Sequence, residues 1–160
     1  MQQHGCQPKL YDDPAEMIST EDADIALIWT PRTEDHVPLG LQAVERGMAV
    51  MIEKPLSEDP AEAMAFVAAA DKAGVTNMVM QNIRWQNAAM EVKEALDEGR
   101  IGQLYWLEVA LRGQHRSFIY EGIHLVDLAR YWYEQDAEWV LALIHISEPT
   151  RPLYSSYAVF

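Results

Sequence analysis

Lys54 and His124 are the two side chains whose types and positions could carry out chemistry. Lys54 follows a short apolar run, Ala49–Ile52, and the acid Glu53, and it stands directly before Pro55. Because proline cannot donate to a strand ladder, the strand ends there and leaves the lysine at its carboxyl end. An ammonium group in that position can polarise a substrate oxygen. The alternative is a surface lysine beside Glu53.

His124 lies at the start of a segment with helical spacing, residues 123–133. An imidazole changes its charge near neutral pH, which suits it to general acid–base catalysis. The simpler interpretation is a histidine whose hydrogen bonds are satisfied at a helix start. Asp127 lies one turn along this helix and Arg130 one turn further, so we expect these two side chains to form an ion pair that braces the helix.

The elements that must position Lys54 alternate between strand and helix. Apolar runs predict strands at residues 25–30, 49–53 and 75–81, with helices starting at Pro14 and covering residues 37–46 and 61–73. The short links between these elements predict a parallel sheet with right-handed crossovers. The wholly apolar central run predicts a strand that is buried on both faces. Ligands of such sheets bind at the carboxyl ends of the strands.

The other two strand ends also carry residues of interest. Thr30 and Pro31 close the first strand, whose end is a neighbour of the central strand's end in a parallel sheet. His36 either faces the same cleft or caps the next helix. Three polar side chains follow the third strand, namely Gln81, Asn82 and Arg84. These three either bind a polyhydroxylated substrate or a cofactor, or satisfy the turn between two domains.

The sequence pattern changes near residue 83, where we place a domain boundary. Beyond it, residues 88–96 predict an amphipathic helix, and residues 102–111 predict a long strand with apolar residues on both faces. The segment 143–160 resembles the in-frame translation of a sequencing-library adapter and its primer, so we expect a non-native tail and exclude it from fold and function. The expected divisions are therefore residues 1–83, 84–142 and 143–160.

Composition argues against several classes of protein. The formal net charge of −13 argues against binding to nucleic acid or to an anionic membrane, which requires clustered lysine and arginine. The single cysteine, Cys6, rules out an internal disulfide framework and fits a cytoplasmic protein. No apolar run approaches the roughly 20 residues of a membrane helix. The sequence has no HxxxH, HExxH or CxxC pattern, so we expect no metal site.

Five motifs, in order and with matching spacing, resemble the Gfo/Idh/MocA oxidoreductases, the family of glucose–fructose oxidoreductase and inositol dehydrogenase. They are Thr30-Pro31 with His36, Gly47 with Glu53-Lys54-Pro55, Gln81-Asn82 with Arg84, Glu98 to Gly102, and Gly122-Ile123-His124 with Asp127. The resemblance implies an α/β protein. Residues 1–83 would form a partial Rossmann domain, a doubly wound parallel sheet that lacks its first βαβ unit. The start of an α/β substrate domain would follow.

The resemblance also implies an activity, the transfer of hydride between NAD or NADP and a carbinol carbon of a sugar, polyol or related small molecule. Lys54 matches the family lysine that contacts the nicotinamide ribose and the substrate, and His124 matches the acid–base histidine. The residues implied in cofactor binding are Thr30, Pro31, His36, Glu53, Lys54, Pro55 and Gln81. Those implied in substrate binding are Asn82, Arg84 and Tyr120. The resemblance further suggests that the parent protein is a homo-oligomer.

Two departures from the family pattern matter. Many members carry an aspartate four residues before the histidine, where this chain has Tyr120, so a non-catalytic metabolite-binding protein on the same fold is the alternative. The family's first strand and its G-x-G-x-x-G loop have no counterpart in the 160 residues. Without that loop no helix N-terminus holds the cofactor pyrophosphate. We therefore expect a fragment of an oxidoreductase, truncated at both ends and inactive alone.

Overall fold

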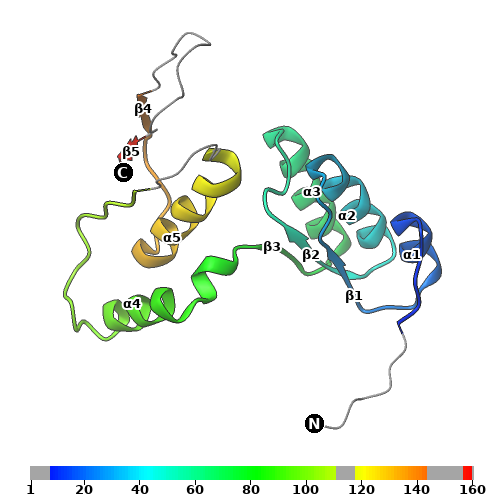
Figure 1. Ribbon diagram of the computed structural model, residues 1–160, viewed down its shortest axis with the longest axis horizontal. Coiled ribbons are helices and arrows are strands. Elements are labelled where there is room, and N and C mark those ends of the chain that lie inside the picture. The colour runs from blue at the N-terminus through cyan, green and yellow to red at the C-terminus, as the bar shows by residue number, and fades with distance from the viewer. Residues whose placement is uncertain (1–7, 111–117, 144–156, 160) are drawn as a thin grey trace. The chain divides into compact units, whose positions relative to one another are not determined.

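The computed structural model describes residues 8–110, 118–143 and 157–159. The chain forms two compact units, Met1–Met80 and Gln81–Phe160, so it divides three residues before the boundary expected near residue 83. Figure 1 shows the helices and strands that make up each unit. Among the described helices, none combines the length and apolar character that a bilayer-spanning helix needs.

The first unit is built on a parallel sheet of three strands in the order β1-β2-β3. Its elements in chain order are α1 (Pro14–Thr20), β1 (Ile25–Ile28), η1 (Thr33–Asp35), α2 (His36–Glu45), β2 (Ala49–Glu53), α3 (Pro60–Ala73) and β3 (Asn77–Met80). This arrangement confirms the α/β class and the partial Rossmann sheet that the sequence predicts. The central strand β2 covers the residues expected for it.

The helices of this unit begin and end at local sequence signals. Asp13 and Asp59 are the N-caps of α1 and α3, and each side chain accepts a 2.8 Å hydrogen bond from the backbone N–H two residues on. A proline occupies the first position of each helix, where its missing N–H costs nothing. Gly74 ends α3 at a φ of 66°, a left-handed conformation that favours glycine.

The core of the first unit lies on one face of the sheet. Helices α2 and α3 lie side by side against the strands (Figure 1). Val50 and Ile52 of β2 and Phe66 of α3 are buried in this core. Residues of the opposite parity are far more accessible, since Ile25 is 63% and Leu27 55% exposed. In the central strand Val50 and Ile52 are buried, whereas Ala49, Met51 and Glu53 are partly exposed. The prediction that this strand is buried on both faces is therefore wrong for the described residues, because the helices pack on one face only.

The second unit is mainly helical in its described residues. Its elements are η2 (Asn82–Trp85), α4 (Asn87–Asp97), the π-helical turn η3 (Phe118–Gly122), α5 (Ile123–Tyr133), β4 (Leu141–Leu143) and β5 (Tyr157–Val159). Strands β4 and β5 pair antiparallel, and β5 falls in the segment expected to be a non-native tail. The helix predicted over residues 123–133 is found with those bounds.

The strand predicted over residues 102–111 does not form in the described residues 102–110. These residues carry no regular secondary structure, and Tyr105 is 90% exposed. A strand needs a neighbouring strand to satisfy its backbone N–H and C=O groups, and the described part of the chain supplies none to this segment. An apolar pattern along one segment is therefore not sufficient to form a strand.

Close packing of α2 against the core leads to a prediction at Gly40. A Cβ at this position would lie 2.8 Å from Ile52 Cδ1 and 2.8 Å from Phe66 Cε2, and both of those side chains are fully buried. Overpacking typically costs about 1–3 kcal/mol, which exceeds the gain of up to about 1 kcal/mol from alanine's better helix propensity. We expect Gly40→Ala to lower the free energy of unfolding by about 1 kcal/mol or more.

Urea denaturation followed by circular dichroism measures this change. The control is Glu45→Ala, which alters an exposed position of the same helix and should change stability by less than about 0.5 kcal/mol. Equal or greater stability of Gly40→Ala would contradict the packing described here.

Candidate functional site

The carboxyl ends of β1 and β2 lie side by side in the first unit. In the parallel register Ile28 is opposite Ile52, so Thr30 and Lys54 each follow their paired residue by two positions. The predicted adjacency of these strand ends is thereby confirmed. Lys54 is half-buried, and its bond to the buried Pro55 is cis. The edge combines a hydroxyl, a carboxylate and an ammonium group, from Thr30, Glu53 and Lys54.

The imidazole of His36 contacts the backbone at both of these strand ends. The ring is buried, with Nδ1 2.8 Å from the carbonyl oxygen of Pro55 and Nε2 3.2 Å from that of Thr30. Both partners are acceptors, and a neutral imidazole donates through only one nitrogen, so the shorter contact to Pro55 is the better candidate for a full hydrogen bond. The described contacts of His36 therefore hold the backbone beside Lys54.

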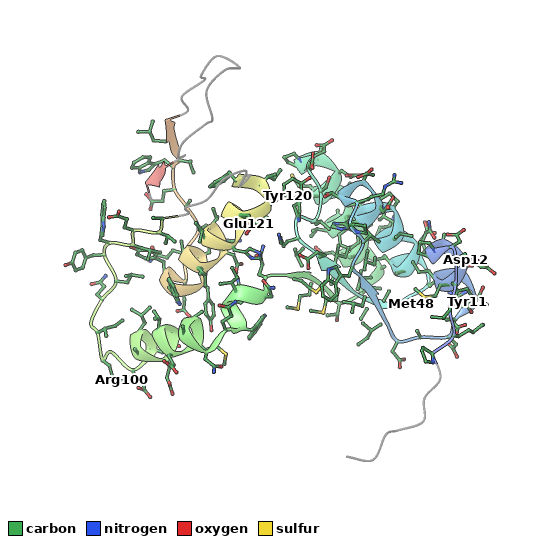
Figure 2. The ribbon with its side chains drawn as sticks, viewed as in Figure 1. Tyr11, Asp12, Met48, Arg100, Tyr120 and Glu121 are labelled. Atoms are coloured by element: carbon green, nitrogen blue, oxygen red, sulfur yellow. The ribbon has the colours of Figure 1, made fainter. Side chains whose placement is uncertain are left out.

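The second unit contributes a buried histidine at the start of α5. His124 is buried, and its Nδ1 lies 2.9 Å from Oε1 of Gln81, the residue that follows β3. The preceding turn η3 carries Tyr120 and Glu121 (Figure 2). Its last residue is Gly122, where a Cβ would overlap the ring of Phe118. A larger residue directly before the helix of His124 would therefore displace the Phe118 ring.

Arg84 and Asp127 form a two-pronged ion pair in the same unit. Arg84 Nε donates to Asp127 Oδ2 at 2.9 Å, and Nη2 donates to Oδ1. Hydrogen bonding to Asp127 raises the pKa of the Arg84 guanidinium, because the carboxylate stabilises the charged form. The guanidinium also lies over the Tyr131 ring, 5.0 Å from its centroid. This pair ties η2 to α5.

The predicted ion pair between Asp127 and Arg130 is wrong. Asp127 binds Arg84, and Arg130 Nε donates instead to Asp136 Oδ1 at 2.9 Å. Arg84 offers two parallel N–H donors from a neighbouring element, a geometry that a residue three positions along the same helix does not match. A signal in the sequence could have suggested the true pairing. Gln81 and Arg84 are three residues apart, as are their partners His124 and Asp127.

The remaining predicted site residues are distributed over both units. Pro31 and Asn82 are exposed, and Thr30 Oγ1 donates to the carbonyl of Arg32 at 2.9 Å. Tyr120 is exposed on the turn before α5. Roles in binding cofactor or substrate stay predictions for all of these residues. Within the described residues, no group of three or more His, Cys, Asp or Glu side chains is placed to hold a metal ion.

The open parallel α/β sheet places this chain among the proteins that bind ligands at the carboxyl ends of their strands, of which the Rossmann folds are an example. The chain belongs to the Gfo/Idh/MocA family, described as an oxidoreductase family with an NAD-binding Rossmann fold, whose model matches residues 2–81. The resemblance drawn from the five sequence motifs is thereby confirmed.

Individual relatives agree with this assignment. D-apiose dehydrogenase of Paraburkholderia graminis is 37% identical over 139 residues, which cover 78% of this chain and 37% of that protein. Myo-inositol 2-dehydrogenase of Thermotoga maritima is 28% identical over 145 residues, covering 84% of this chain and 43% of the relative. The crystal structure of a probable dehydrogenase from Thermotoga maritima aligns with a TM-score of 0.72 at 26% identity, covering 86% of this chain and 46% of that one. The chain thus spans less than half the length of these relatives.

The contacts of His36 predict its contribution to stability. His36→Phe keeps most of the ring volume but leaves the buried carbonyl of Pro55 without its donor, which typically costs about 1–3 kcal/mol. His36→Asn retains an N–H donor near the position of Nδ1, so we expect it to recover part of this loss. Urea denaturation of the two variants separates the hydrogen bond from the packing. A phenylalanine variant as stable as the parent chain would show that the contact contributes nothing.

The Arg84–Asp127 pair should couple strongly in a double-mutant cycle. The two side chains are only 30% and 11% exposed, whereas those of Arg130 and Asp136 are 60% and 81% exposed. We expect a coupling energy of about 1–3 kcal/mol for Arg84→Met with Asp127→Asn. The matched cycle, Arg130→Met with Asp136→Asn, should give less than about 1 kcal/mol, because solvent screens exposed pairs. Equal coupling in both cycles would refute a special role for the first pair.

Proposed function

We propose that this chain is part of an NAD(P)-dependent oxidoreductase that interconverts a carbinol and a carbonyl group of a sugar, polyol or related small molecule. The observation that carries the proposal is Lys54, a lysine held at the carboxyl end of the central parallel strand in a member of an oxidoreductase family. Dehydrogenases of D-apiose and of myo-inositol among its relatives support the substrate class.

The reaction assigns different tasks to two side chains. Oxidation of a carbinol removes a hydride from carbon and a proton from oxygen, and the nicotinamide, when bound, supplies the hydride acceptor. His124 takes the proton from the hydroxyl oxygen as general base, and returns it in the reverse direction. Lys54 donates a hydrogen bond to a substrate oxygen on which negative charge develops. Lysine supplies a point charge with three donors, and histidine supplies the exchangeable proton.

The residues present fit one end of the cofactor only. The strand edge beside Lys54 offers the hydroxyl of Thr30 and the carboxylate of Glu53, which suit a ribose and its nicotinamide. The 160 residues contain no G-x-G-x-x-G sequence to receive the pyrophosphate at a helix N-terminus. We therefore propose that the chain alone does not hold the cofactor, and that activity belongs to a longer protein of the relatives' length.

Kinetics of the complete protein test the reaction. The reading frame would be extended with the genomic sequence that flanks it, and NAD⁺ and NADP⁺ reduction would be followed by absorbance with a panel of sugars and polyols. We expect Lys54→Ala and His124→Ala each to lower kcat/KM by about 10²–10⁴-fold. The control Lys72→Ala removes an exposed lysine in the last turn of α3 and should leave activity unchanged. Full activity in both Lys54→Ala and His124→Ala would contradict the proposal.

Cofactor titration of the 160-residue chain tests the second part. We expect no saturable change in NADH or NADPH fluorescence up to about millimolar cofactor, because the phosphate cradle contributes much of the binding. Binding with sub-millimolar affinity would contradict this expectation and leave the oxidoreductase assignment intact.

The second candidate is a metabolite-binding protein that does not catalyse the reaction. It is favoured by Tyr120, which is exposed on the turn before α5. Many members of the family that the chain resembles carry an aspartate at this position, four residues before the histidine. A polyol that binds the complete protein in calorimetry, without any change at the nicotinamide absorbance band, would support this candidate over the first.

A further inference from the structure

The contact between Gln81 and His124 is the first of three that follow one another along the second unit. Gln81 Oε1 is 2.9 Å from His124 Nδ1, Arg84 Nε donates to Asp127, and Trp132 Nε1 donates to the carbonyl of Ala89 at 3.1 Å. In each pair the partners are 43 residues apart in sequence. The segment that begins at Gln81 therefore runs in register alongside α5 and fixes the position of that helix.

The first of these contacts also bears on where the proton of His124 sits. A neutral imidazole carries one proton, either on Nδ1 or on Nε2, and the partner of one nitrogen decides between the two tautomers. An amide oxygen can only accept a hydrogen bond, so Gln81 Oε1 at this distance requires the proton on Nδ1. The lone pair of the neutral ring is then on Nε2, which becomes the nitrogen that exchanges a proton with an oxygen.

The neutral amide has a second consequence. A carboxylate at the same place would fix the same tautomer but would also stabilise the imidazolium form by its charge. Gln81 holds the ring without adding a negative charge beside it. A histidine that both takes up and releases a proton in a reversible reaction benefits when neither protonation state is strongly favoured.

We propose that Gln81 is a positioning residue for His124, which fixes the ring orientation and places its proton on Nδ1 so that Nε2 acts as the acid–base atom. The inference rests on the proposed function for its catalytic consequence, but the tautomer itself is independent of activity. It gives Gln81 a role different from the cofactor contact implied by the sequence resemblance.

Nitrogen NMR of the 160-residue chain tests the tautomer directly. Long-range ¹H–¹⁵N correlation spectra distinguish a protonated from an unprotonated ring nitrogen, and a His124→Asn variant assigns the signals. We expect Nδ1 to be protonated in the parent chain and in Gln81→Glu, which keeps an oxygen acceptor. Gln81→Leu should populate both tautomers. The control Gln86→Leu changes an exposed glutamine five residues away and should leave the His124 spectrum unaltered.

Folding of the variants is checked first by circular dichroism and urea denaturation. The Arg84–Asp127 and Trp132–Ala89 contacts do not involve Gln81, so the leucine variant is expected to keep its helices. If Gln81→Leu does not fold, Gln81→Met takes its place, because it keeps the length of the side chain but lacks the amide oxygen. An unprotonated Nδ1 in the parent, which would mean that the amide nitrogen faces the ring, overturns the inference. An unchanged tautomer in a folded Gln81→Leu overturns it as well.

Kinetics of the complete protein separate positioning from cofactor binding. Loss of the ring orientation should lower kcat by about 100-fold in Gln81→Leu, with restoration of most activity in Gln81→Glu. The KM for the nicotinamide cofactor should stay within about twofold, whereas loss of a cofactor contact would raise it. A raised cofactor KM with normal kcat would overturn the positioning role. Absence of any oxidoreductase activity would overturn the proposed function alone, since the tautomer spectra stand without it.

Discussion

The in-register parallel pairing of β2 with both of its neighbours is the contact on which the first unit depends. Because Ile28 is opposite Ile52, and Glu53 is opposite Met80, all three strands end at one edge. The burial of Val50 and Ile52 beneath α2 and α3 holds this register, since a slip by one residue would turn these side chains to the other face. Lys54 therefore stands at the carboxyl edge as a consequence of core packing several residues away.

In the second unit, polar contacts fix the positions of the helices that carry the candidate site residues. The Arg84–Asp127 pair loses hydration on burial, and its two parallel hydrogen bonds offset that cost only in one geometry. A pair of this kind therefore specifies an arrangement more than it adds stability. It fixes α5 against η2, and with α5 it fixes the place of His124. The exposed Arg130–Asp136 pair, by contrast, costs little to form and specifies little.

The different tasks proposed for Lys54 and His124 follow from the chemistry of their side chains. A lysine at a sheet edge provides a positive charge that persists through the reaction, which suits an oxygen that becomes more negative. A histidine exchanges its proton near neutral pH, which suits an oxygen that gains or loses hydrogen. The supporting groups differ accordingly, because His36 fixes backbone beside Lys54, while Gln81 contacts the ring of His124 itself.

Local signals in the sequence determined most of the element boundaries. Asp13 and Asp59 accept hydrogen bonds at helix starts, Gly74 adopts the left-handed conformation at a helix end, and Pro55 stops a strand, each through the chemistry of one residue and its neighbours. The same signals, with the Glu53-Lys54-Pro55 and Gly122-Ile123-His124 motifs, were sufficient to recognise the family.

Only the tertiary structure decided the partners of groups far apart in sequence. Asp127 binds Arg84 and not Arg130, the apolar strands are covered on one face, and the apolar segment 102–110 forms no strand in the described part of the chain. Pairing of this kind depends on which surfaces meet, and a pattern along one segment carries no information about the segment that will face it.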